Sequence, residues 1–172
     1  QVTIARGQRV LVLGDGKLGI LCALALKLTG AQILLAGKYP GKLSIAARQG
    51  ISTLLVKNLP QNNPFDIVVE ATGSAQGLDN AMQFTRPRGT IILKSTVAGS
   101  IPINLAPIVI NEVTVVGSRC GPFKPALQAL ADGSIDVEPL ITEVFPAHKA
   151  EEALSAAEKR GNLKILIDFK HV

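Results

Sequence analysis

Six short apolar segments, rich in β-branched residues, recur along this 172-residue chain and constrain its fold more than any other feature. Segments that are apolar along their whole length are typical of strands in a parallel sheet covered on both faces. Segments with helical spacing of apolar residues lie between several of them, so the sequence predicts a parallel sheet with right-handed crossovers. The predicted strands are 9–13, 32–36, 52–56, 66–71, 90–94 and 113–117.

The loop GDGKLG, residues 14–19, joins the first predicted strand directly to a helical segment. In this context Gly14 permits a tight turn, Gly16 lets a pyrophosphate approach the backbone, and Gly19 lets helix and strand pack closely. The helix that follows offers free amides and a positive dipole end to a diphosphate. We therefore expect a dinucleotide-binding, doubly wound Rossmann sheet with strand order 3-2-1-4-5-6; the alternative is a tight turn with incidental glycines.

The end of the second predicted strand lacks the acid that usually binds the ribose 2′-hydroxyl of NAD. Gly37 stands there, 18 residues after Gly19, and Lys38 and Lys42 follow. A glycine leaves room for a 2′-phosphate and two lysines can bind it, so the sequence favours NADP over NAD. Alternatively, both lysines are solvated surface charges. Asp15 argues against an anion site unless its side chain points away.

Composition excludes several classes of protein. No uninterrupted apolar run reaches the roughly 20 residues of a membrane span, so we expect a soluble, cytoplasmic chain without a membrane partner. Cys22 and Cys120 lie far apart without CxxC spacing, which predicts reduced thiols. Residues 1–64 carry eight Lys or Arg against one acid, but these are scattered and lack stacking aromatics. A small anion is therefore expected as the partner, and nucleic acid is not.

The alternation of strand and helix stops after residue 119. A helix is predicted at about 123–132, an extended stretch at 139–146, a second helix at 148–161 and a last strand at 163–169. We therefore expect a nucleotide-binding domain over residues 1–119 and a separate helical and extended C-terminal segment over residues 120–172.

Several motifs together resemble the medium-chain dehydrogenase/reductase family, the zinc-type alcohol dehydrogenases. They are RVLVLGDGKLG, DIVVEATGS, RPRGTIILKST, EVTVVGSRCGP and the C-terminal series PLITEVFP, EEALSAAEK and LKILIDF, in the family's order over nearly the whole chain. The resemblance implies hydride transfer between a nicotinamide and an alcohol, aldehyde or ketone. It also implies a separate N-terminal domain that supplies any zinc and most of the substrate pocket. We expect the chain to start after that domain, to return toward it through residues 120–172, and to be inactive alone.

The resemblance assigns cofactor-binding roles to the loops that follow the strands. It places the pyrophosphate turn at Gly14, Gly16, Lys17, Leu18 and Gly19, and the part that selects NADP at Gly37, Lys38 and Lys42. Thr72 and Gly73 resemble the turn beside the adenosine ribose; Lys94, Ser95 and Thr96 resemble the turn that meets the nicotinamide ribose and carboxamide. Cys120 falls where a backbone group touches the carboxamide, and Lys164 where a cation meets the pyrophosphate. Outside the glycine loop, each could instead be ordinary turn chemistry or a surface cation.

No catalytic or metal-binding residue is assigned to this chain. Catalytic zinc needs three protein ligands. The two Cys and the two His of this chain are isolated in the sequence; the histidines are His148 and His171. A nucleotide sensor without chemistry remains an alternative function. A methyltransferase is disfavoured by the complete GxGxxG loop and by the missing acid.

The apolar stretch 99–118 is predicted to be extended and to lie at the sheet edge beside the sixth strand. An exposed apolar edge favours a two-fold partner, and the resembling family commonly dimerises through this region. We therefore expect a homodimer with an interface between Ile101 and Val116. The alternative is that Pro102 and Pro107 interrupt the edge and the stretch folds back on its own domain.

Overall fold

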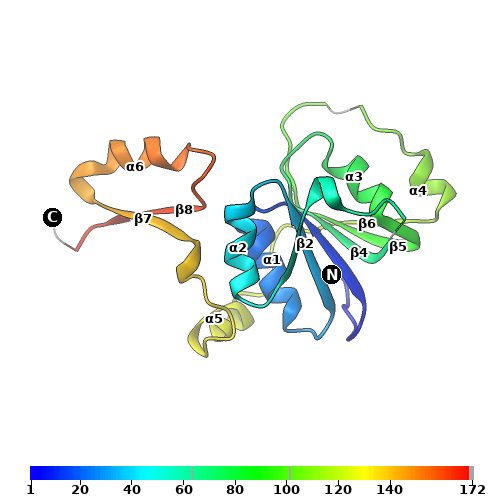
Figure 1. Cartoon of the computed structure of the whole chain (residues 1–172), viewed down its shortest axis with the longest axis horizontal. Helices are drawn as coiled ribbons and strands as arrows, with labels where there is room; N and C mark the ends of the chain where they lie inside the picture. Colours follow the sequence, from blue (N-terminus) through cyan, green and yellow to red (C-terminus); the bar gives the residue numbers. More distant parts are fainter. Residues whose placement is uncertain (63, 101, 171–172) are drawn as a thin grey trace. The chain divides into compact units, whose positions relative to one another are not determined.

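The computed structural model describes residues 1–62, 64–100 and 102–170, in two compact units, 1–123 and 124–172. Ile101 and His171 thus lie outside the described residues. The first unit is built on a six-stranded parallel sheet whose order, β3-β2-β1-β4-β5-β6, is the predicted one (Figure 1). Its strands are β1 (Arg9–Leu13), β2 (Gln32–Gly37), β3 (Ser52–Leu55), β4 (Phe65–Glu70), β5 (Thr85–Leu93) and β6 (Thr114–Gly117).

Helices α1 (Lys17–Lys27) and α2 (Pro40–Arg48) cover one face of this sheet, and α3 (Gly77–Phe84) lies on the other (Figure 1). The short helix α4 (Ala106–Ile110) precedes β6, and a 3-10 turn, Val56–Asn58, follows β3. The central strand β1 is almost completely buried because it has neighbours on both sides and helices on both faces. The largest fully buried side chains include Leu11, Leu13, Ile20, Leu35 and Ile91, so the core of this unit is mainly aliphatic.

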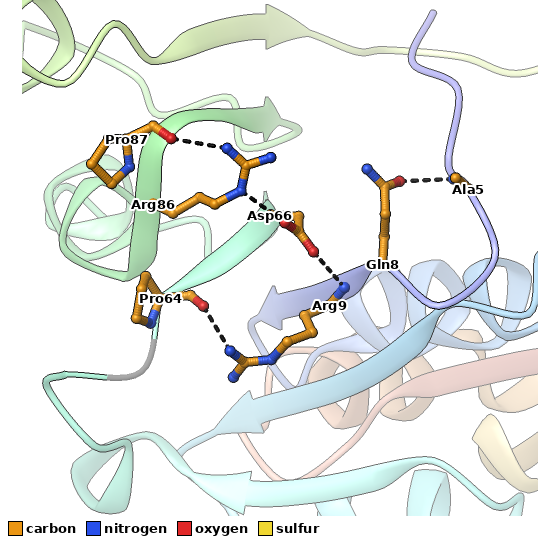
Figure 2. Close-up of polar contacts among 7 residues, drawn as sticks. All are labelled: Ala5, Gln8, Arg9, Pro64, Asp66, Arg86 and Pro87. Carbon is orange, nitrogen blue, oxygen red and sulfur yellow. Dashed lines mark hydrogen bonds and ion pairs between the residues drawn. The ribbon is translucent and has the colours of Figure 1, made fainter.

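One predicted boundary in the first unit was wrong by five residues. Strand β5 begins at Thr85, directly after α3 ends at Phe84, although this strand was predicted to begin at residue 90. Thr85 Oγ1 donates to the carbonyl of Ala81 over 2.7 Å, and Arg86 then turns toward Asp66 at the start of β4. Figure 2 shows this polar cluster, in which Arg9 also donates its backbone N–H to Asp66.

The stretch 99–118 is not extended throughout, because α4 interrupts it before β6. Val109 and Ile110 on this helix are 75% and 77% exposed. The apolar character noticed in the sequence therefore belongs largely to a helix surface beside the sheet edge.

The second unit follows the predicted series of elements. Helix α5 (Phe123–Ala131) leads into a 3-10 turn (Glu138–Leu140) and β7 (Ile141–Pro146); a second 3-10 turn (Ala147–Lys149), helix α6 (Ala150–Ala157) and β8 (Lys164–Asp168) complete it. Strands β7 and β8 pair in parallel, with α6 as their crossover. The helical and extended C-terminal segment expected from the sequence is thus a small unit with its own sheet.

Candidate functional site

The register of the sheet aligns the ends of its strands along one edge. Leu13 pairs with Ala36 and with Glu70, Glu70 pairs with Leu93, and Leu93 pairs with Gly117. Loops after these residues therefore meet at the carboxyl edge, where open α/β sheets bind ligands. All but one of the site residues predicted from the sequence lie in these loops, at the last residue of β2 or at the start of α1 or α2.

The glycine loop has two packed glycines and one open one. Gly14 has φ +117°, and a Cβ there would lie 2.5 Å from the carbonyl oxygen of Ala71. A Cβ on Gly19 would overlap the carbonyl oxygen of Gly14, so these two positions require glycine for packing. A Cβ on Gly16 would meet nothing within 4 Å. The backbone at Gly16 is therefore open to the outside.

Helix α1 begins immediately after Gly16, which occupies its N-cap position without a side-chain cap. Lys17 and Leu18 are exposed, and the first amides of a helix have no i−4 carbonyl to bind. An open glycine beside free helix amides fits a diphosphate, because the backbone can be approached closely and the dipole is positive there.

The side chain of Asp15 points toward the end of β2. Its carboxylate is buried, and Oδ2 accepts hydrogen bonds from the backbone N–H groups of Lys38 (2.7 Å) and Tyr39 (2.6 Å). A Cβ on Gly37 would overlap the Asp15 side chain. The space beside Gly37 therefore holds this carboxylate, which corrects the expectation that glycine leaves room there for a phosphate.

The cations after β2 remain accessible. Lys38 is exposed, Lys42 is half-buried in the first turn of α2, and its Nζ lies 5.1 Å from the centre of the Tyr39 ring. Tyr39 is 41% exposed. Two ammonium groups and an aromatic face thus occupy the end of β2, where an anion or an adenine could be bound.

The turn after β4 is held by a buried acid that the sequence analysis did not single out. Glu70 is 1% exposed, and its Oε1 accepts hydrogen bonds from the Thr72 backbone N–H (2.8 Å) and hydroxyl (2.6 Å). Gly73 has φ +66°, and its N–H donates to Ser95 Oγ over 2.8 Å. The predicted residues Thr72, Gly73 and Ser95 are therefore joined in one network across β4 and β5. An acid directly after the apolar residues 67–69 was the available signal for Glu70.

Lys94 ties the end of β5 to the segment after β6. Its Nζ donates to the carbonyl oxygen of Ser118 (3.0 Å) and lies 3.3 Å from Ser118 Oγ. Thr96 and Cys120 are exposed nearby along the chain. A cavity of about 370 Å³ opens between these segments and the N-terminal residues, and its lining includes Gln1, Ile4, Ile92, Lys94, Ser118 and Cys120.

Lys164 is the predicted site residue that lies elsewhere. It is exposed at the first position of β8, in the second unit. Its contact with a pyrophosphate stays a prediction.

No three His, Cys, Asp or Glu side chains gather into a potential metal site within residues 1–62, 64–100 and 102–170. The described residues therefore do not fit a zinc centre. Over the same residues, no helix is both long and apolar enough to span a bilayer.

Comparison with known proteins places these observations in a family. Sorbitol dehydrogenase of Bombyx mori is 29% identical over 98% of this chain and 53% of its own length. The chain thus spans about half the length of the curated relatives it matches.

Solved structures share the fold. L-idonate 5-dehydrogenase of Escherichia coli superposes with a TM-score of 0.87 at 26% identity, over 95% of this chain and 51% of the other. A Sinorhizobium meliloti protein bound to NADP has a TM-score of 0.85 at 23% identity, over 95% and 53%. An Escherichia coli alcohol dehydrogenase complexed with NADH has a TM-score of 0.84 at 22% identity, over 96% and 53%.

The sequence profile of the zinc-binding dehydrogenases matches residues 18–132, which is more than half of the chain. This match covers α1 from its second residue, strands β2 to β6 and α5. Together with the glycine loop and the strand order, it shows that the chain belongs to the zinc-binding dehydrogenase family.

Proposed function

We propose that this chain binds a nicotinamide dinucleotide along the carboxyl edge of its six-stranded sheet, as the cofactor-binding part of an alcohol dehydrogenase-like oxidoreductase. The observation that carries the proposal is the glycine loop, where Gly14 and Gly19 are packed and Gly16 is open. When bound, the nicotinamide supplies the hydride chemistry, and the protein supplies binding and orientation.

Different residues along this edge would bind different parts of the nucleotide. The open backbone at Gly16 and the first amides of α1 would hold the pyrophosphate. The turn formed by Thr72 and Gly73 would border the adenosine ribose, and the segments that contain Ser95 and Cys120 would hold the nicotinamide end. No step is assigned to zinc, because the described residues do not form a site for it.

NADP is the preferred nucleotide in this proposal. Lys38 and Lys42 place two cations at the end of β2, and each charge-assisted contact to a 2′-phosphate strengthens binding about tenfold or more. Solved structural neighbours include one with NADP and one with NADH, so the family fold accommodates both.

Three further proposals concern the substrate class, the domain organisation and assembly, and the location of the protein. The names of the sorbitol and L-idonate dehydrogenases support a small alcohol or carbonyl substrate. We further propose that residues 1–119 form the nucleotide-binding domain, that residues 120–172 return toward a catalytic domain, and that the protein is a cytoplasmic homodimer.

Gly16→Val tests nucleotide binding without disturbing the packing. The added side chain would enter open space, and φ −74° at Gly16 suits any residue. The free energy of unfolding should therefore fall by only about 1 kcal/mol, as it does when a favourable helix cap is lost. Calorimetry should show at least about tenfold weaker binding of NADPH. Gly161→Val, also at an open glycine but in the second unit, is the matched control and should bind normally. Equal binding by both variants would overturn the proposal.

A further inference from the structure

The carboxylate of Asp15 acts as an internal anion at the end of β2. This side chain is 8% exposed, and a single oxygen, Oδ2, accepts the backbone N–H groups of both Lys38 and Tyr39. Successive backbone N–H groups that converge on one point form a typical anion-binding arrangement in proteins. Here that arrangement is filled by the protein's own carboxylate, which comes from the glycine loop.

This contact requires a residue without a Cβ at position 37, where Gly37 stands. A Cβ at residue 37 would lie 2.5 Å from Oδ2 of Asp15 and closer still to its Cβ and Cγ. An acid at residue 37 and the observed position of Asp15 therefore exclude each other. The edge of the sheet keeps one carboxylate near the end of β2, but supplies it from the loop after β1.

Two lysines belong to the segment whose backbone binds this carboxylate. Lys38 donates one of the two N–H groups and its side chain is exposed, and Lys42 follows in the first turn of α2. A 2′-phosphate attracted by the two lysines would meet the negative charge of Asp15 and would find the two amides already bonded. A 2′-hydroxyl would meet no such repulsion and could donate to the carboxylate.

We propose that Asp15 is a specificity-determining residue. Its carboxylate binds the backbone N–H groups of Lys38 and Tyr39 as an internal anion, and so lowers the preference for NADP that Lys38 and Lys42 provide. The inference rests on the proposed nucleotide site. Two unit charges about 6 Å apart change an affinity about threefold in water and about tenfold if the effective dielectric constant is half that of water. An effect of about three- to tenfold on the ratio of NADPH to NADH affinity is therefore expected.

The test is Asp15→Asn in the whole chain, with calorimetric titration of NADPH and NADH. The amide oxygen of asparagine can still accept from both backbone N–H groups, so the fold should persist while the charge is removed. The ratio of NADPH to NADH affinity should rise about three- to tenfold, mainly because NADPH binds more tightly. Asp15→Ser, which keeps a smaller acceptor oxygen, should shift the ratio in the same direction.

Glu112→Gln is the matched control. It also removes one carboxylate from the first unit, but Glu112 precedes β6 and so lies at the amino edge of the parallel sheet. Its side chain is 74% exposed, and the ratio should not change. An unchanged or lower ratio in Asp15→Asn, with the wild-type chain binding both nucleotides, would overturn this inference alone. A wild-type chain that binds neither nucleotide would overturn the proposed function and this inference with it.

Discussion

Arg86 Nε donates to Oδ1 of Asp66 over 2.7 Å and so ties the first residues of β5 to the first residues of β4 (Figure 2). The second carboxylate oxygen of Asp66 accepts the backbone N–H of Arg9 at the start of β1 (2.8 Å). Arg9 in turn donates to the carbonyl of Pro64 (3.1 Å) and lies over the ring of Phe65. One acid therefore joins three central strands at the amino edge, opposite the proposed nucleotide site.

Loss of this acid should destabilise the fold in a pH-dependent way. The hydrogen bond from Arg86, and then that from the Arg9 backbone, hold the pKa of Asp66 below its usual range. A depressed pKa in the folded state contributes stability that is present above the unfolded pKa, near 4, and is lost as the pH falls through the folded value. Asp66→Asn should therefore lower the free energy of unfolding at pH 7 by about 1 to 2 kcal/mol, and by less below about pH 4.

Urea unfolding at pH 7 and at low pH measures this difference. Glu112→Gln is a suitable control because its pair with Arg88 is long, at 3.7 Å, and both side chains are largely exposed. Such surface pairs contribute about 0 to 1 kcal/mol. A destabilisation by Asp66→Asn that is equal at both pH values would contradict the role given to its charge.

Nucleotide preference gives a second prediction. The wild-type chain should bind NADPH at least about tenfold more tightly than NADH at low salt, because Lys38 and Lys42 attract the 2′-phosphate. Added salt should narrow the gap by screening these exposed charges. Lys38→Asp should reverse the preference, whereas Lys159→Asp, an exposed change in the second unit, should leave it in place. Calorimetry with equal affinities in the wild type would refute the NADP assignment.

The sequence was a good guide to this sheet because its signals are local. Apolar β-rich segments, glycines at turns and helical spacing each act within a few residues, and the doubly wound order follows from their alternation. The contact between Asp15 and residues 38 and 39 could not be predicted in this way. It joins parts of the chain 23 and 24 residues apart, and only the folded register shows that Gly37 faces the Asp15 side chain.

The misplaced start of β5 has the same physical cause. The start of β5 depends on a hydrogen bond from Arg86 to Asp66, 20 residues earlier, which helical spacing in the preceding segment does not reveal. Similarly, the sequence shows Glu70 only as an acid after the apolar residues 67–69. Its role in holding Thr72 emerges only when its side chain is found buried and turned toward that residue.

The two thiols should react at different rates. Burial raises the pKa of the Cys22 thiol, and the positive charge of Lys94 offsets part of that rise. The thiolate is the reactive form, so Cys22 should react slowly near pH 8, while the exposed Cys120 should react quickly. A disulfide reagent such as DTNB should therefore show one fast thiol, which Cys120→Ser removes.

Bound nucleotide should protect the fast thiol, since the proposed site places the nicotinamide end beside the segment that contains Cys120. NADPH at saturating concentration should slow the reaction of Cys120 several-fold and leave that of Cys22 unchanged. Two thiols of equal reactivity, or a fast phase that persists in Cys120→Ser, would contradict the assignment.

The last prediction concerns assembly and rests on the exposed face of α4. Val109 and Ile110 are more than 70% exposed on this helix, and the neighbouring β6 pairs only with β5 among the described strands. An apolar helix surface beside an open strand edge favours a second copy that covers both. Light scattering should therefore find a homodimer at micromolar concentration.

Ile110→Lys should weaken this homodimer by placing an unpaired charge in the interface. Leu154→Lys, at a 66% exposed leucine of the second unit, should not weaken it. A wild-type monomer under these conditions would favour the alternative, in which Pro102 and Pro107 protect the edge of a single copy.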